Sequence, residues 1–224
     1  AKYKKKDEEI EVVGDKVLIA SGRGPVVEGL NLDGIGIEYD RSGIHVDKEF
    51  QTTQEGVYAI GDVNNLGIQL AHVASAQGVY VMEKLMGLEP DINLDVYPSC
   101  VFTLPEVAWV GMTEEELKES GVDYKVSKFL FAANGKALSL GEAEGFVKIF
   151  ASPEDKKVLG VTILGPHAND LIHEGAMAIA NGLDINSIAR TIHAHPTLSE
   201  AFYEATLGLE DAAIHIAPPR RRKR

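Results

Sequence analysis

Short apolar segments separated by turn residues fill the first part of the chain, and this pattern predicts strands. Residues 9–13 alternate between polar and apolar positions, and residues 16–20 form an apolar run that suits a strand covered on both faces. Residues 43–46 and 56–60 are two further candidate strands. Each candidate is short and bounded by glycine or charged residues, as strands commonly are.

A long amphipathic helix is predicted over residues 70–86. Its apolar stripe consists of Leu70, Ala74, Val81 and Leu85. Gly87 follows as the residue at which this helix ends. Strands followed by a helix predict an α/β region for this part of the chain.

The pattern changes after about residue 95, where strands come first and helices follow. Pro90 and Pro98 bracket an irregular stretch that marks the boundary. Residues 113–116 form a capping box that begins a helix ending at Gly121. The other elements predicted are strands at 99–103, 106–110, 124–130, 145–150 and 158–164, and helices at 168–181, 184–192 and 198–207. This order predicts an α+β domain, so the chain divides into 1–95, 96–216 and a basic tail at 217–224.

Charge is distributed unevenly along the 224 residues. Nine of the 22 basic residues lie within 2–6 and 220–224, so the segment 7–219 holds 13 basic and 34 acidic residues, a net charge of −21. A body this acidic repels phosphate backbones, and basic ends of this length are typical of solvated tails. No nucleic-acid partner is therefore expected.

Hydropathy and cysteine usage restrict the class of protein further. No apolar run reaches the length of a membrane-spanning helix, and no apolar stretch follows the basic N-terminus as in a secretory signal. No membrane partner and a cytoplasmic location are expected. Cys100 is the single cysteine, so the chain forms no internal disulfide and holds no dithiol pair. We interpret Cys100 as a buried, unreactive thiol in a strand.

The densest cluster of candidate catalytic residues lies near the C-terminus. Pro196 disfavours helix at His195, which leaves that histidine extended just before a helix. Histidine is the natural general acid–base group at neutral pH, and a carboxylate such as Glu200 could fix its tautomer. Residues 197–200 also fit a capping box, so Glu200 alternatively serves only its helix. Zinc bound by His193, His195 and Glu200 is a weaker alternative, and no metal site is predicted.

A second candidate site is Gly61 followed by Asp62, at the end of a predicted strand. Ligands of α/β sheets bind beyond the carboxyl ends of strands, where a carboxylate can accept hydrogen bonds from sugar hydroxyls. Asp62 alternatively stabilises a turn, as aspartate does in many loops. His72 begins the long helix, whose N-terminus offers free backbone N–H groups. Gly22 starts a partial G-x-G-x-x-G match, which fails at Val27 and indicates only a connector.

Residues 193–202, with the sequence His-Ala-His-Pro-Thr-Leu-Ser-Glu-Ala-Phe, resemble the C-terminal signature of the dihydrolipoamide dehydrogenases over its whole length. Glutathione reductases share only the H-P-T-x-x-E core of this signature. Other segments that resemble blocks of the same family are 103–111, 131–134 and 159–166 of its interface domain, and 59–63 and 70–72 of its second flavin-binding segment. The resemblance extends from about residue 17 to residue 210, in family order.

The resemblance implies roles for particular residues. His195, oriented by Glu200, would be the acid–base group for dithiol–disulfide interchange with the disulfide of the partner subunit. Asp62, after Gly61, would bind the ribityl chain of FAD, and Gly22 would approach NAD. The backbone groups that would face the flavin ring belong to Gln69, Leu70, Ala71 and His72.

The reaction implied for the parent enzyme oxidises dihydrolipoamide and passes electrons through a disulfide and FAD to NAD. The 224 residues contain neither the flavin fingerprint, nor the redox cysteine pair, nor the NAD fingerprint of the family. The resemblance therefore implies a C-terminal fragment, in which an α/β remnant of the FAD/NAD-binding region precedes an α+β interface domain with a mixed antiparallel sheet. We expect this fragment to bind neither cofactor and to be inactive alone.

The implied partners are a second copy of the chain, bound through the interface domain, and a parent 2-oxo acid dehydrogenase or glycine cleavage complex. Two alternative functions stay open. The fold could serve only as a non-catalytic dimerisation module, or the chain could be a half-enzyme whose flavin and disulfide come from another polypeptide.

Overall fold

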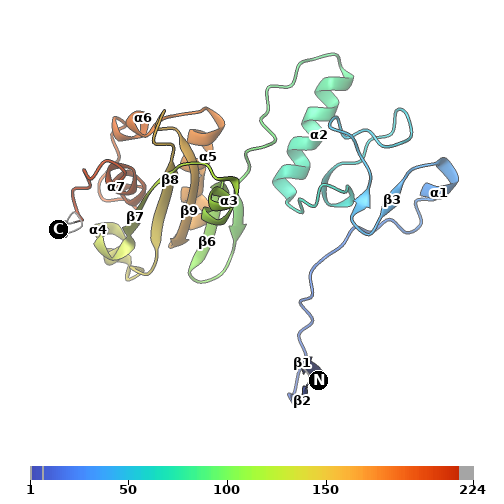
Figure 1. Cartoon of the computed structure of the whole chain (residues 1–224), viewed down its shortest axis with the longest axis horizontal. Coiled ribbons are helices and arrows are strands. Elements are labelled where there is room, and N and C mark those ends of the chain that lie inside the picture. The colour runs from blue at the N-terminus through green and yellow to red at the C-terminus, as the bar shows by residue number, and fades with distance from the viewer. Residues whose placement is uncertain (1, 7, 217–224) are drawn as a thin grey trace. The chain divides into compact units, whose positions relative to one another are not determined.

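The structure is a computed structural model that describes residues 2–6 and 8–216. The chain divides into two compact units, and the division falls between Glu89 and Pro90 (Figure 1). The first unit carries the candidate cofactor residues, and the second carries His195 and Glu200. The predicted basic tail at 217–224 lies outside the described residues.

Two small hairpins and two helices make up the first unit. Its strands are β1 (Lys2–Lys5), β2 (Glu8–Glu11), β3 (Tyr39–Asp40) and β4 (Gly43–Ile44), which pair antiparallel as β1–β2 and β3–β4. Its helices are α1 (Leu32–Ile35) and α2 (Ala71–Leu85), with the 3-10 turn η1 (Gly61–Val63) between them. A small core consists of Leu32, Ile37, Ile44 and Ala59. The helix predicted over 70–86 is confirmed to within one residue at each end.

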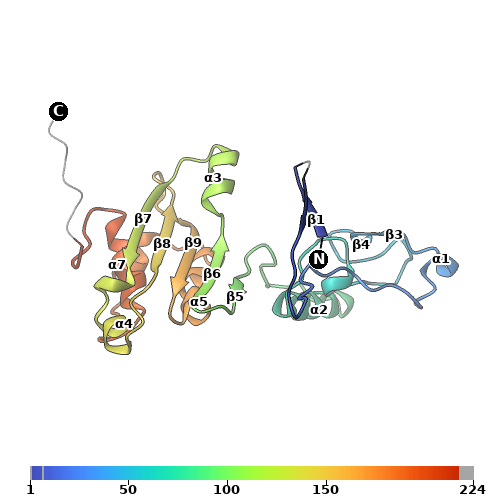
Figure 2. The ribbon, with the colours of Figure 1, turned by 90° about the horizontal axis from the view of Figure 1, so that it is seen from below.

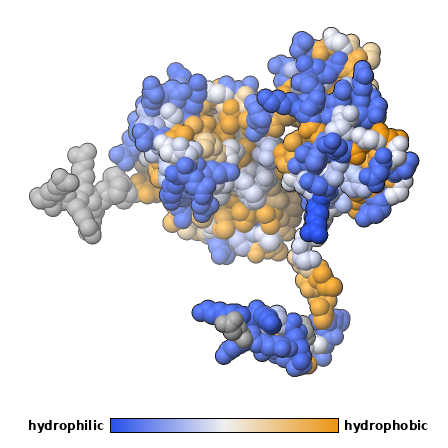
Figure 3. Space-filling view, turned by 45° about the vertical axis from the view of Figure 1, so that its right-hand side comes forward, coloured by the Kyte–Doolittle hydropathy of each residue, from blue (hydrophilic) through white to orange (hydrophobic). Residues whose placement is uncertain are grey.

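The strand predicted at 16–20 is wrong. Residues 12–27 contain neither helix nor strand, and Val17, Leu18 and Ile19 are exposed. Figure 3 shows a hydrophobic stretch next to the hydrophilic N-terminal hairpin. An apolar strand covered on both faces needs neighbouring strands and packed layers, and the described residues of this unit supply none. The strand predicted at 56–60 is likewise reduced to one bridge, between Gln51 and Tyr58.

Helix α2 buries a face that differs from the predicted stripe. Val73, Gln77 and Val81 are buried at a spacing of four residues, whereas Leu85 is exposed. Gln77 is tolerated there because its side-chain oxygen accepts a hydrogen bond from the backbone N–H of Gly61 at 2.7 Å. A pattern that counted only apolar residues missed this glutamine and so shifted the stripe.

A five-stranded antiparallel sheet forms the centre of the second unit. Its strands are β5 (Ser99–Val101), β6 (Glu106–Gly111), β7 (Lys125–Leu130), β8 (Phe146–Ala151) and β9 (Val158–Gly165). They lie in the order β5-β6-β9-β8-β7, as Figure 2 shows, and every neighbouring pair is antiparallel. The prediction of an α+β domain with an antiparallel sheet is confirmed.

The helices of the second unit are α3 (Glu114–Ser120), α4 (Gly135–Leu140), α5 (Ala168–Ala180), α6 (Ile185–Ala189) and α7 (Glu200–Gly208). The capping box at 113–116 is confirmed, because the Thr113 hydroxyl accepts from Glu116 N and Thr113 N donates to the Glu116 carboxylate. Helix α4 was not predicted; Asn134 caps it by accepting from Ala137 N at 2.9 Å. No helix in the described ranges has the length and apolarity that crossing a membrane requires.

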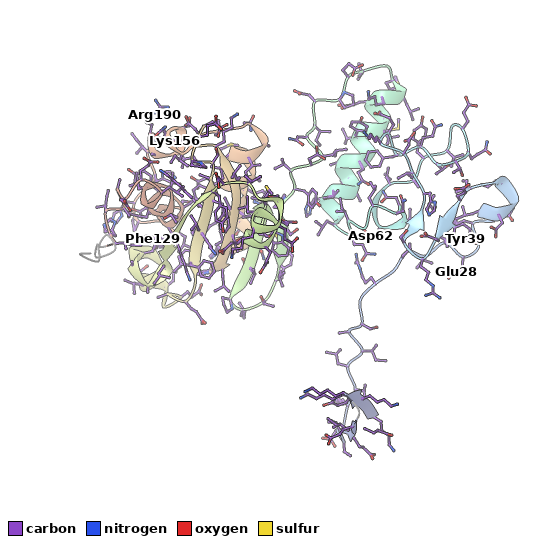
Figure 4. All side chains as sticks on the ribbon, viewed as in Figure 1. Glu28, Tyr39, Asp62, Phe129, Lys156 and Arg190 are labelled. Carbon is purple, nitrogen blue, oxygen red and sulfur yellow. The ribbon has the colours of Figure 1, made fainter. Side chains whose placement is uncertain are left out.

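The core of the second unit lies between one face of the sheet and helices α5 and α7. Val147 and Ile149 of β8 pair with Ile163 and Val161 of β9, and all four side chains are buried. Phe129 of β7, labelled in Figure 4, belongs to the same core. Strand alternation thus places an apolar face beneath α7, the helix that begins with Glu200.

Helix α7 also holds the segment that follows it. Glu204 is buried, and its Oε2 accepts hydrogen bonds from Ile214 N at 2.8 Å and His215 N at 3.1 Å. Its Oε1 lies 2.7 Å from Nδ1 of His215. A buried carboxylate requires such partners, so Glu204 ties residues 214–215 to the helix.

Candidate active site

His195 lies in the loop between α6 and α7, and its ring reaches Glu200 at the start of α7. Nδ1 of His195 is 2.8 Å from Oε1 of Glu200. The His195 side chain is 77% exposed, and no hydrogen-bond partner for Nε2 is found among the described residues. The ring is therefore held by one nitrogen and presents the other to solvent.

Glu200 contacts both the ring of His195 and the backbone of the loop that precedes α7. While Oε1 contacts the ring of His195, Oε2 accepts a hydrogen bond from Thr197 N at 2.8 Å. The Thr197 hydroxyl donates to Ala194 O at 2.7 Å, and α7 has no side-chain cap. The capping box predicted at 197–200 is thus only half formed, and the carboxylate of Glu200 links the loop to the ring.

Opposing effects act on the pKa of Glu200. Partial burial acts to raise the pKa, but hydrogen bonds from Thr197 N and from His195, with the charges of His195 and His215, lower it below its ordinary value. Glu200 is therefore ionised at neutral pH. Because a carboxylate can only accept, Nδ1 of His195 carries a hydrogen, and Nε2 of the neutral ring can take up a proton from a ligand.

The lowered pKa of Glu200 predicts a pH dependence of stability. A carboxyl group with a lowered pKa stabilises the fold fully above its unfolded pKa, near 4.5, and the contribution is lost as pH falls through the folded pKa. We expect Glu200→Gln to lower the free energy of unfolding at neutral pH and to have a much smaller effect at about pH 3. Urea unfolding followed by the fluorescence of Trp109, the single tryptophan, measures the difference. Equal effects at both pH values would contradict the prediction.

His193, two positions before His195, turns to a different carboxylate. Its Nε2 is 2.7 Å from Oε1 of Glu174 on α5. The alternative of a zinc site formed by His193, His195 and Glu200 is wrong, because each histidine pairs with its own carboxylate. Within residues 2–6 and 8–216, no three His, Cys, Asp or Glu side chains form a group that could hold a metal ion.

In the first unit, Gly61 fixes the turn that carries Asp62. Gly61 has a φ of +70°, and a Cβ added to it would lie 2.8 Å from Cβ of Ala74. Only glycine accommodates both the backbone conformation and this close approach. The side-chain oxygen of Gln77 accepts from Gly61 N at 2.7 Å and from Nδ2 of Asn64 at 3.2 Å, which holds both ends of the turn against α2.

Asp62, labelled in Figure 4, forms an ion pair with Arg23. Nη2 of Arg23 donates to Oδ2 of Asp62 at 2.6 Å and to the backbone oxygen of Gln69 at 3.3 Å. Arg23 thus brings the connector after residue 20, the turn at Asp62 and the segment before α2 together. The sequence did not indicate Arg23, because a contact between residues 39 positions apart leaves no local pattern.

The remaining predicted cofactor residues lie around this contact. Gly22 precedes Arg23, is exposed and has a φ of +100° with open space at its Cβ position. Leu70 precedes α2 without capping it through its side chain, and Ala71 and His72 are exposed first residues of the helix. A carboxylate that accepts hydrogen bonds and the N-terminus of a long helix fit the hydroxyl chain and electron-rich edge of a flavin nucleotide.

Cys100 lies on β5 as a free, half-buried thiol, less buried than the sequence predicted. Burial raises the pKa of this thiol, and the carboxylates of Glu106 and Asp170 raise it further. The thiol is therefore protonated at neutral pH, which makes it a poor nucleophile.

Comparison with known proteins places both units in one family. Residues 97–206 match the family described as pyridine nucleotide-disulphide oxidoreductase, dimerisation domain, and residues 1–78 match the family described as pyridine nucleotide-disulphide oxidoreductase. The chain is 49% identical over 210 residues to the mitochondrial dihydrolipoyl dehydrogenase of Pisum sativum, which covers 93% of this chain and 42% of that protein. It is 48% identical over 205 residues to leghemoglobin reductase of Glycine max, covering 91% and 39%. The chain thus spans about two fifths of the length of the curated relatives it matches.

Solved structures agree with this assignment. The flavoprotein disulfide reductase RclA of Escherichia coli aligns with a TM-score of 0.81 at 29% identity, covering 92% of this chain and 47% of that one. The LpdA protein of Mycobacterium tuberculosis aligns with a TM-score of 0.77 at 32% identity, covering 83% and 40%. The chain therefore belongs to the pyridine nucleotide-disulphide oxidoreductase family.

Proposed function

We propose that this chain is the C-terminal part of a dihydrolipoyl dehydrogenase, in which His195 is the acid–base group of dithiol–disulfide interchange. The observation that carries the proposal is the ring of His195, bound through Nδ1 to an ionised carboxylate and open to solvent at Nε2. This pair lies in the segment that matches the dimerisation domain. The relatives named dihydrolipoyl dehydrogenase support the choice of reaction.

In this function, Nε2 of His195 takes the proton of a dihydrolipoamide thiol while the resulting thiolate attacks a protein disulfide. This attack breaks the protein S–S bond, forming a mixed disulfide and releasing the other protein sulfur as a thiolate. The second thiol of dihydrolipoamide then displaces the remaining protein sulfur, so the substrate leaves as its cyclic disulfide. Of its two protons, one stays on His195 and the other on a protein thiol. Glu200 stabilises the imidazolium that forms, because its carboxylate accepts from Nδ1. In the parent enzyme, Asp62 and the start of α2 would hold FAD, which would supply the two-electron redox chemistry that links the dithiol to NAD.

The protein disulfide has to come from residues other than Cys100, the single cysteine of the chain. The match to a dimerisation domain fits a homodimer, and in the proposed enzyme the partner subunit presents its disulfide to His195. Membership of a 2-oxo acid dehydrogenase or glycine cleavage complex belongs to the same proposal. We expect the chain alone to bind neither FAD nor NAD and to be inactive.

A chimera tests the proposal. This chain replaces the matching part of the Pisum sativum dihydrolipoyl dehydrogenase, and the reduction of NAD by dihydrolipoamide is measured. We expect activity in the chimera and none in the chain alone. Reduction of a dye by NADH requires flavin but no dithiol chemistry, so it shows that the chimera is folded. A chimera that reduces the dye but leaves dihydrolipoamide unoxidised would reject the proposal.

A further inference from the structure

His193 is the side chain that turns inward on the N-terminal side of His195. Its side chain is 7% exposed and the residue as a whole is half-buried, whereas every other residue from Arg190 to Pro196 is exposed. Its ring lies against Tyr203 of α7, with centroids 5.0 Å apart and planes inclined at 33°. On its other side Nε2 contacts Glu174 of α5. One ring thus connects an otherwise exposed loop to two helices.

The contacts of this ring require one proton between His193 and Glu174. Nδ1 of His193 is 3.0 Å from the backbone oxygen of Thr191, which can only accept, so Nδ1 carries a hydrogen. Nε2 is 2.7 Å from Oε1 of Glu174, and that contact needs a further proton on either atom. Burial raises the pKa of Glu174, and the hydrogen bond and charge of His193 only partly offset this. The 2.7 Å contact thus places one proton between the two groups, whether the pair is written as an ion pair or as two neutral groups.

The two sides of His195 are fixed by different means. On the C-terminal side, the backbone N–H of Thr197 donates to Glu200, and its carbonyl accepts from Nδ2 of Asn134 at 3.0 Å. On the N-terminal side, Ala194 O accepts from the Thr197 hydroxyl, and the side chain that ties the loop to α5 is that of His193, two residues away. Among residues 2–6 and 8–216, the His195 side chain forms one hydrogen bond, to Glu200, so its position depends on these anchors.

We propose that His193 and Glu174 are positioning residues that hold the loop against α5, so that His195 meets Glu200. The importance of this pair for catalysis rests on the proposed function. The effect of the pair on the contact between His195 and Glu200 is independent of the proposed function, because all four residues lie in the second unit.

Nitrogen-15 NMR of the histidine-labelled, 224-residue chain tests the proposal by reading the tautomer of each ring. Neutral His195 is expected as the Nδ1–H form in the wild type. In Glu174→Ala we expect its ring signals to shift toward the Nε2–H form that an unrestrained histidine prefers. Glu174→Gln should restore the wild-type signals, because its amide N–H can donate to Nε2 of His193.

Two further variants complete the design. Asp170→Ala removes a carboxylate of α5 that lies 3.3 Å from His167, and it should leave His195 unchanged. His193→Phe keeps a ring against Tyr203 but loses both hydrogen bonds, and it should shift His195 as Glu174→Ala does. Should Glu174→Ala fail to fold, as judged by the backbone amide signals of a uniformly nitrogen-15-labelled sample, the signals of His195 in His193→Phe test the proposal instead.

A folded variant that lacks the pair but keeps wild-type His195 signals would overturn the proposal. This outcome leaves the chimera assay untouched, and an inactive chimera leaves the NMR result untouched. The two proposals can therefore fail independently.

Discussion

His195→Gln is expected to lower the rate of dihydrolipoamide oxidation by the chimera by about 10²- to 10⁴-fold, the usual contribution of a positioned general acid–base group. Glutamine can still donate a hydrogen bond to Glu200 but cannot take up a proton from a thiol near neutral pH. The loss should appear in kcat at saturating dihydrolipoamide. Steady-state NADH formation measures it.

A matched control is His167→Gln, which removes another exposed histidine with a carboxylate neighbour, Asp170 at 3.3 Å. It should leave the rate unchanged, and NADH-dependent dye reduction should be the same in both variants. If His195→Gln lowered kcat by less than about tenfold, the loss would be too small for an acid–base group, and another residue would have to serve as the acid–base group.

Phe202→Ala is expected to lower the free energy of unfolding of the second unit by about 3–5 kcal/mol. Phe202 is 0% exposed and belongs to the core between the sheet and α7. Its truncation loses apolar burial and leaves a cavity beneath the helix that carries Glu200. Urea unfolding followed by Trp109 fluorescence reports the change, because Trp109 lies on β6 of the same unit.

Leu138→Ala is the control for this substitution. Leu138 lies on α4 and is 57% exposed, so its truncation should change the free energy of unfolding by no more than about 0.5 kcal/mol. If both substitutions lowered the free energy of unfolding equally, the loss in Phe202→Ala could not be attributed to the burial of its side chain. A loss below about 1 kcal/mol in Phe202→Ala would show that the core closes around the missing ring.

The sequence predicted the second unit better than the first for a physical reason. Strands such as 145–150 and 158–164 are rich in apolar residues, and their partners in the sheet lie within the same unit. The apolar run at 16–20 carries an equally strong local signal, yet it is exposed because neighbours that would cover it are not among the described residues. A local apolar pattern predicts that a segment tends to be buried, whereas its actual burial depends on whether neighbouring strands and helices cover it.

The same distinction applies to the candidate sites. His195 and Glu200 are five positions apart, and the proline between them predicted an extended segment before a helix, so their pairing could be anticipated. Glu174 lies 19 positions before His193, and Arg23 lies 39 before Asp62. Gln77 did leave a signal, since it is a polar residue on the buried face of α2. Attention to this polar residue within an otherwise apolar helix face would have identified Gln77 as the hydrogen-bond partner of Gly61.

The hydrogen bonds from residues 214–215 to Glu204 determine where the chain can be shortened at its C-terminal end. A version shortened to Gly208 would lose the N–H groups of Ile214 and His215 and the ring of His215, leaving a buried carboxylate without these donors. Water would have to enter to replace these donors, and its entry would loosen the packing of α7. A version that ends after Ile216 keeps all three donors. An affinity tag or fusion partner joined there would extend from an anchored point instead of from the helix itself.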